Sequence, residues 1–358
     1  MKYRVLDNEE EILQKIMEIS SISNNNDNII KARFLQKLFF EYGVNDVIID
    51  PVGNVVAKIQ GEKEGSIALF SDLENLHKLE VSKTKVTMKD IIGKGVGTNA
   101  FPLYSLTALA KVFKKSREKH KTIYFICFAE GRTTFKGIKY FLKNLPEKID
   151  TMIYLRGLEE GRLEKSTSAS INCDILFKDI DSNYIHEENK NHLFYGIAKL
   201  ILKIKEEDTG EMFNFKIENI NNSNDINGQY ILSVVITSES LLSAKQGLKI
   251  LQEIVEGVKS EENLIIELQE NFVRDGVICK EDKLYSIFYE ILKNREIKIY
   301  NISESSQIAV PISEGIETVY IGIGKGGNFN KDSEYLEIKS IYRGIELIYE
   351  ALTKYDDN

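Results

Sequence analysis

The chain has 358 residues, 42% of them hydrophobic and 28% charged, which predicts one large folded domain or two smaller ones. Its formal net charge of −8 argues against nucleic acid or an anionic membrane as a partner. No apolar run approaches the roughly 20 residues of a membrane span, and the charged N-terminus is unlike a signal peptide. Three widely spaced cysteines predict free, buried thiols in a cytoplasmic protein.

Apolar spacing in the first part of the chain predicts alternating helices and strands. Residues 9–19 and 30–42 have the spacing of helices. Ser66–Phe70 is a short apolar run, typical of a strand buried on both faces, and it stops at Ser71-Asp72-Leu73-Glu74. Open α/β sheets place ligand sites at such strand ends. Further strands are expected over 53–59, 79–88, 122–129 and 151–155, with helices over 102–115 and 138–145.

The pattern changes from about Arg162. Six segments follow in the order of the ferredoxin-like split motif, β-α-β-β-α-β: 168–177, 191–205, 213–220, 230–237, 243–258 and 264–268. A helix over 282–293, strands over 298–302 and 318–322, and a helix over 341–352 complete the chain. We therefore predict an α/β core of residues 1–162 and 271–358 with a mostly parallel sheet, interrupted by a ferredoxin-like domain at 163–270.

Two sequence motifs connect the chain to a known family. Residues 50–55, DPVGNV, match an Asp-x-x-Gly-Asn-(Val/Ile) run, and residues 334–338, EYLEI, match a Glu-(Tyr/Phe)-(Ile/Val) segment near the end. From about Val44 to Lys354 the chain resembles the dinuclear zinc exopeptidases of the peptidase T, aminoacylase and succinyl-diaminopimelate desuccinylase family. The resemblance implies a peptidase-like core, zinc as the family's cofactor, and an inserted lid or dimerisation domain.

The chain departs from this family at the positions that carry its chemistry. The family's zinc ligands and general base are a His-x-Asp pair, a bridging Asp, a Glu pair, an acid after a later strand and a final His. The matching degenerate positions here are Asp72, Glu74, Thr98, Glu130, Gly131, Arg132 and Asn330. Glu130 recovers a carboxylate only by a one-residue slip, and Glu159 is the acid nearest the strand ending at Arg156. Without imidazole ligands, no zinc or other cofactor is expected.

Alternatives remain open at this stage. Asp72, Glu74 and Glu130, with Asp332, could hold Mg²⁺, Mn²⁺ or Ca²⁺, which prefer oxygen ligands. Arg132 with Lys94 could bind a peptide C-terminus or another small carboxylate, because a guanidinium holds a carboxylate by two parallel hydrogen bonds. Arg132 could equally pair with Asp72 or Glu74. The closest match to a family histidine that completes the partner subunit's site is His186.

The sequence thus favours a metallopeptidase homologue that has lost zinc and catalysis and acts as a binding or assembly protein. The alternative is a divergent metal-dependent peptidase or amidohydrolase acting on small peptides or N-acyl amino acids. A third interpretation is a purely structural homodimer formed through residues 163–270, since an exposed sheet edge is a liability unless it is covered.

Overall fold

The computed structural model describes residues 8–22, 28–74, 84–130, 134–145, 147–178, 187–208, 210, 212–222, 229–302, 304 and 306–357. The chain divides into two compact units, each with its own hydrophobic core. The first comprises Met1–Ser166, Ile278–Ile302 and Ser306–Asn358, and the second comprises Thr167–Val277 with Ser303–Ser305. No helix in the described part of the chain is long and apolar enough to cross a membrane.

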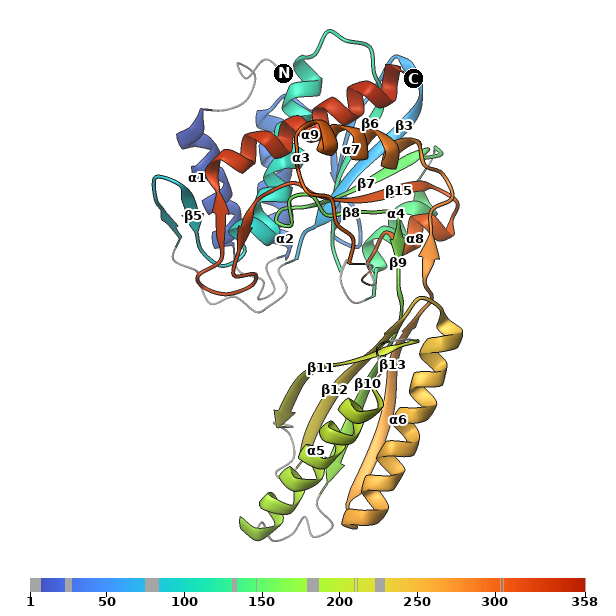
Figure 1. The fold of residues 1–358 in the computed structure, drawn as a ribbon. Coiled ribbons are helices and arrows are strands. Elements are labelled where there is room, and N and C mark those ends of the chain that lie inside the picture. Colours follow the sequence, from blue (N-terminus) through green and yellow to red (C-terminus); the bar gives the residue numbers. More distant parts are fainter. Residues whose placement is uncertain are drawn as a thin grey trace. The chain divides into compact units, whose positions relative to one another are not determined.

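The first unit is an α/β domain (Figure 1). Its helices are α1 (Glu9–Ser21), α2 (Asn28–Glu41), α3 (Phe101–Lys115), α4 (Lys136–Asn144), α7 (Lys283–Asn294), α8 (Ala309–Ser313) and α9 (Ile338–Asp357), with a π-helical turn at Val96–Ala100 before α3. Its strands are β1 (Asp46–Ile49), β2 (Val55–Ile59), β3 (Lys63–Asp72), β4 (Lys85–Val86), β5 (Asp90–Ile92), β6 (Lys121–Phe128), β7 (Thr151–Arg156), β8 (Leu163–Glu164), β15 (Glu317–Gly322), β16 (Gly326–Gly327) and β17 (Tyr335–Glu337). The two-residue strands β9 (Ser166–Thr167) and β14 (Val277–Ile278) lie at the boundaries between the two units.

Seven strands form the central sheet in the order β1-β2-β6-β3-β7-β15-β8. The four inner strands β6, β3, β7 and β15 run parallel, and the outer strands β1, β2 and β8 pair antiparallel. The central parts of the inner strands are apolar and buried, as is typical of parallel strands covered on both faces. Their carboxyl ends therefore meet at one edge of the sheet, where open α/β sheets bind ligands.

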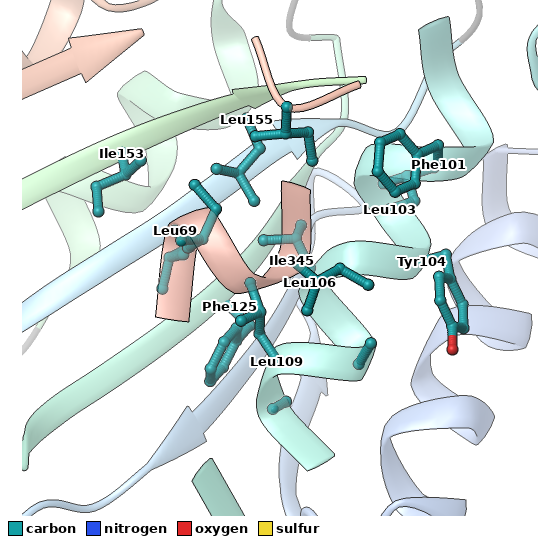
Figure 2. Packing of buried hydrophobic residues seen from close by; sticks show 14 of the residues in the cluster. Leu69, Phe101, Leu103, Tyr104, Leu106, Leu109, Phe125, Ile153, Leu155 and Ile345 are labelled. Atoms are coloured by element: carbon teal, nitrogen blue, oxygen red, sulfur yellow. The ribbon is translucent and has the colours of Figure 1, made fainter. Parts of the chain in front are cut away.

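One face of the sheet carries the larger core. Leu69, Phe125, Ile153 and Leu155 project from β3, β6 and β7 toward α3 and α9 (Figure 2). Helix α3 is buried along nearly its whole length, with Pro102 in its first turn, where the missing N–H of proline costs no hydrogen bond. The alternate residues of the same strands consequently face the other side of the sheet.

That other face carries an aromatic row. The strand register aligns Phe70 of β3 with Tyr154 of β7 and Tyr154 with Tyr320 of β15. The rings of Phe70 and Tyr154 are stacked with centroids 5.0 Å apart, and Tyr154 meets Tyr320 edge-on at 5.2 Å. Two residues further along the same face come Asp72 and Arg156, the last residues of β3 and β7.

The second unit is a ferredoxin-like domain. Its elements are β10 (Ala169–Lys178), α5 (Glu187–Glu207), β11 (Asn214–Asn222), β12 (Gln229–Ser238), α6 (Leu241–Glu262) and β13 (Ile265–Arg274). The strands form an antiparallel sheet in the order β11-β12-β10-β13, and α5 and α6 lie on one face of it (Figure 1). Strands β11 and β13 are the two edges.

The predicted fold class is confirmed, with an α/β core and an inserted β-α-β-β-α-β domain. The predicted strand over 298–302 is wrong. Only Tyr300 forms a bridge there, to Arg162, because the N–H of Ile302 donates to the side chain of Glu164 instead of to a strand. Helix α8 was not predicted. Of the strand expected over 79–88, residues 85–86 form β4, while 84, 87 and 88 lie outside any strand. Residues 79–83 are outside the described part of the chain.

The three cysteines, Cys127, Cys173 and Cys279, are free and buried, as expected. Burial raises the pKa of the Cys127 thiol far above its usual value and that of Cys173 to about 12. Both thiols therefore stay protonated and unreactive in the folded protein.

Asn54 joins the start of β2 to the segment after β6. Its Oδ1 accepts a hydrogen bond from the N–H of Ala129 at 2.9 Å, and its Nδ2 donates to Asp50 Oδ2 at 2.7 Å and to the carbonyl of Gly137 at 3.0 Å. The side chain is fully buried, so each partner loses its hydrogen bond if the amide is removed.

Replacing Asn54 with Ala should lower the free energy of unfolding by about 3 kcal/mol, since each buried polar group left unpaired costs about 1–3 kcal/mol. Urea unfolding would measure the change. The matched control is Asn144→Ala, because Asn144 is exposed and donates only to the carbonyl of Tyr140 one turn earlier. Equal losses in both variants would contradict this role for Asn54.

Candidate functional site

The candidate site lies at the carboxyl ends of β3, β7 and β15, on the face of the sheet that carries the aromatic row. Asp72 is the last residue of β3 and is 2% exposed. Tyr154 donates its hydroxyl to Asp72 Oδ2 at 2.5 Å, and Gln307 Nε2 donates to Asp72 Oδ1. Arg156 Nη1 lies 3.5 Å from Asp72 Oδ2. Donors of this chain therefore occupy both oxygens of the carboxylate.

Arg156 also faces a second carboxylate, that of Glu159. The Nε atom of Arg156 lies 3.9 Å from Glu159 Oε2, and the side chain of Arg156 is 18% exposed. Burial lowers the pKa of this guanidinium, but the negative groups around it, Asp72 and Glu159 among them, raise it well above the usual value. Arg156 is thus a permanent cation between two carboxylates.

Glu159 is held firmly in this position. It accepts a hydrogen bond from the Tyr320 hydroxyl at 2.5 Å, and its other oxygen lies 2.6 Å from Nη1 of Arg162. Its backbone has φ +71°, a left-handed conformation that non-glycine residues adopt at a cost. These two contacts compensate for that strain.

A second, more deeply buried ion pair adjoins the first. Arg162 donates from Nε to Glu164 Oε1 at 2.8 Å and from Nη2 to Glu164 Oε2 at 3.2 Å. The guanidinium lies over the ring of Tyr320, 4.3 Å from its centroid. Three carboxylates and two guanidinium groups thus form one polar network beside the strand ends.

The segment that follows β3 is fixed by a buried lysine and asparagine. Asn99 Nδ2 donates to the carbonyls of Asp72 and Glu74, both at 3.0 Å, and Asn99 Oδ1 accepts from Lys31 Nζ at 3.0 Å. Lys31 is fully buried on α2. The Glu74 carboxylate accepts from Asn28 Nδ2 at 3.0 Å and from the N–H of Glu130 at 2.9 Å, so it caps local structure.

Two of the predicted site positions, Thr98 and Asn330, are brought together by Glu334. One oxygen of Glu334 accepts hydrogen bonds from the N–H groups of Gly97 and Thr98, at 2.9 and 2.8 Å, and the Thr98 hydroxyl bonds both of its oxygens. The N–H of Asn330 donates to the other oxygen at 2.9 Å. Glu334 is fully buried, and all its bonds serve to join the Gly-rich loop to the segment before β17.

Of the remaining predicted residues, the structure describes Glu130 and Lys94. Glu130 forms an exposed ion pair with Lys136 at 3.2 Å. Lys94 lies in the turn between β5 and the π-helical segment. Gly131, Arg132 and His186 lie outside the described part of the chain, so their roles stay predictions.

The residues at these strand ends do not fit a zinc site. Catalytic zinc is held by three protein ligands from histidine, cysteine or carboxylate and keeps one open position. Among the described residues, no three His, Cys, Asp or Glu side chains lie together so that they could hold a metal ion. Asp72 accepts hydrogen bonds from a tyrosine and an amide and faces a guanidinium. Glu334 accepts hydrogen bonds from backbone N–H groups on both of its oxygens.

Several side chains of the site were not singled out from the sequence: Tyr154, Arg162, Glu164, Gln307, Tyr320 and, on α2, Lys31. Tyr154 could have been found, because it lies two residues before Arg156 and so shares its face of the strand. Gln307 could not, since it precedes the unpredicted helix α8. Lys31 looks like a solvated residue of an amphipathic helix.

Comparisons with known proteins support the fold assignment. No family model matches the sequence, and no curated protein matches it significantly. A tripeptidase from Staphylococcus aureus superposes with a TM-score of 0.75 at 18% identity, covering 99% of this chain and 100% of that one. The aminopeptidase PepT from Bacillus cereus gives 0.71 at 15% identity, with coverage of 98% and 99%.

An amidase of the hydantoinase/carbamoylase family from Burkholderia vietnamiensis gives a TM-score of 0.74 at 8% identity over the full length of both chains. A dinuclear metal-binding M20-family peptidase from Bacillus subtilis gives 0.65 at 13% identity, with 98% of each chain covered. The fold expected from the sequence resemblance is therefore confirmed: this chain has the two-part fold shared by these peptidases and amidases.

Proposed function

We propose that this protein is a metal-free, non-catalytic homologue of the zinc exopeptidases and acts as a binding or assembly protein. One observation carries the proposal: Asp72 is already bonded by Tyr154 and Gln307 and lies 3.5 Å from the Arg156 guanidinium. A metal ion at this carboxylate would have to compete with these donors and would be repelled by the guanidinium charge. The competing function is a metal-dependent peptidase or amidase, which the fold of the compared enzymes favours.

Binding is proposed because the chain has the fold of the compared peptidases and amidases, while the polar residues at its strand ends hydrogen-bond to one another. Glu334, Asn99 and Lys31 are buried and bonded within the chain, which supports a rigid surface and not an exposed reacting group. We propose a peptide or small carboxylate as the ligand, with Arg132 and Lys94 as its cationic partners and His186 as a further candidate. We also propose a cytoplasmic location, which the three free cysteines support.

Self-association is proposed through the inserted domain. Its sheet ends in the edge strands β11 and β13, and exposed apolar side chains lie on both, with Ile220 on β11 and Ile265, Phe272 and Val273 on β13. Natural proteins cover or charge such edges because unpaired backbone groups recruit further strands. A second copy of the chain is the partner we propose, and neither nucleic acid nor a membrane is expected.

Protein purified without chelator should contain no stoichiometric zinc, manganese or magnesium by elemental analysis. Its thermal melts in EDTA and in added zinc should coincide, because a metal that binds only the folded state would raise the melting temperature by mass action. Tripeptides and N-acyl amino acids should not be hydrolysed in the presence of these metals. Bound metal together with hydrolysis that EDTA abolishes would establish the enzyme and refute the proposal.

Calorimetry with short peptides should detect binding that requires a free peptide carboxylate, and Arg132→Ala should abolish it, because a guanidinium can form two parallel hydrogen bonds with a carboxylate. Amidated peptides of the same sequence are the control ligands. Equal binding of the peptides by the wild type and the variant would contradict the proposal that Arg132 binds the carboxylate.

Light scattering at high micromolar concentration should give the mass of a dimer. Lysine substituted at Ile220 or at Val273 should reduce the dimer fraction for whichever edge strand pairs, since a charge on the edge opposes strand addition. Leu242→Lys is the control, because Leu242 is also exposed but lies in the first turn of helix α6 and not on a strand. A monomeric wild type would exclude self-association of this kind.

A further inference from the structure

The side chain of Arg156, at the end of β7, is held by charge and makes no hydrogen bond to the described part of the chain. Its Nη1 lies 3.5 Å from Asp72 Oδ2, and its Nε lies 3.9 Å from Glu159 Oε2. Hydrogen bonds between a cationic N–H and a carboxylate are about 2.7–2.9 Å long, so both contacts are ion pairs without a hydrogen bond. These two carboxylates therefore leave the N–H donors of the guanidinium unused.

The ion pairs are this long because other donors already hold the two carboxylates. Each oxygen of the pair accepts from a group other than Arg156. These donors are Tyr154 and Gln307 for Asp72, and Tyr320 and Arg162 for Glu159. Arg156 thus supplies charge to both carboxylates and keeps its N–H groups for another acceptor.

The neighbouring arginine has the opposite arrangement. Arg162 donates to Glu164 from Nε and Nη2, at 2.8 and 3.2 Å, and to Glu159 from Nη1 at 2.6 Å. Its side chain is 3% exposed, whereas that of Arg156 is 18% exposed. Arg162 is therefore a structural residue, while Arg156 keeps partly exposed donors at the sheet edge where open α/β sheets bind ligands.

The charges around Arg156 decide which chemical group suits these donors. Its positive charge already lies between the negative charges of Asp72 and Glu159. A ligand carboxylate at the same guanidinium would add a third negative charge, which these two would repel. An uncharged carbonyl oxygen accepts hydrogen bonds without that repulsion. The surroundings therefore favour an amide carbonyl over a carboxylate at Arg156.

We propose that the guanidinium of Arg156 binds a main-chain carbonyl group of a peptide ligand. The planar guanidinium presents its N–H groups in a fixed arrangement, which gives these hydrogen bonds a defined direction. The inference rests on the proposed function, in which a peptide is the ligand and Arg132 with Lys94 holds its carboxylate. Arg156 adds recognition of the peptide group itself.

The test measures the binding of tri-alanine and of two analogues by calorimetry, each analogue with one of the two peptide carbonyls changed to a thiocarbonyl, a weaker acceptor. One analogue should bind the wild type about tenfold more weakly, near the lower end of what a hydrogen bond to a charged group contributes. The same analogue and tri-alanine should bind Arg156→Met equally, because the variant has no donor to lose. A merely structural role for Arg156 would not produce this coupling between residue and carbonyl.

Two further variants complete the test. Arg156→Lys keeps the charge beside Asp72 and Glu159 and so should keep the melting temperature of the wild type, yet it should bind tri-alanine about tenfold more weakly, because an ammonium lacks the planar donors. It also tests the inference if Arg156→Met does not fold. The control is Arg343→Lys, since Arg343 is half-exposed and pairs with Glu160 at 3.2 Å; its binding should match the wild type.

The inference and the proposed function can fail separately. A wild type that binds no tripeptide refutes both the peptide ligand and the role of Arg156. A wild type that binds tri-alanine and both analogues equally, or an Arg156→Lys variant that binds tri-alanine as tightly as the wild type, refutes only the role of Arg156.

Discussion

The pairing of Asp72 with Arg156 across two neighbouring strands is the interaction on which the site depends. The register of β3 and β7 ends at Phe70 and Tyr154, and both charged residues lie two positions beyond, on the same face. Removing one partner of a buried ion pair costs about 3–5 kcal/mol, because the other charge is left uncompensated. Arg156 therefore stabilises the ionised form of Asp72 at its buried strand end, together with Tyr154 and Gln307.

Other buried charged groups of the site are compensated in different ways. Glu334 accepts from four hydrogen-bond donors, three of the Gly-rich loop and one of Asn330. Such charge-assisted hydrogen bonds are stronger than neutral ones. Lys31 reaches the strand end indirectly, through the Asn99 amide. The strand ends thus retain polar side chains at a position suited to ligands, but these side chains bond within the chain.

Much of the fold was predictable from the sequence because its signals are local. The apolar runs of the inner strands, the helical spacing before and after them, and the β-α-β-β-α-β order of the insert each depend on neighbouring residues. The wrong prediction of a strand over 298–302 shows the limit of such local signals. Its residues look like a strand, yet the side chain of Glu164, far away in sequence, accepts the hydrogen bond of Ile302.

The candidate site was predictable only in part, for the same reason. Asp72 could be placed at a strand end from its position after Phe70. The arginine that faces it could not be identified, because this requires the register between two parallel strands, which no local pattern specifies. The sequence suggested Arg132 as a possible partner of Asp72, and this stays a prediction because Arg132 lies outside the described residues. Arg156 of β7, which the structure places beside Asp72, was not suggested. Thr98 and Asn330 likewise come together because both donate hydrogen bonds to Glu334, although the two residues are more than 200 positions apart in the sequence.

The central claim is that the guanidinium of Arg156, and not a metal ion, neutralises Asp72. Anomalous diffraction from crystals of the wild-type protein grown in excess Zn²⁺ and Mn²⁺ tests it most directly. The account predicts no anomalous peak within bonding distance of Asp72, with the side chain of Arg156 between Asp72 and Glu159. A peak at the Asp72 carboxylate, with Arg156 displaced from it, would contradict the account.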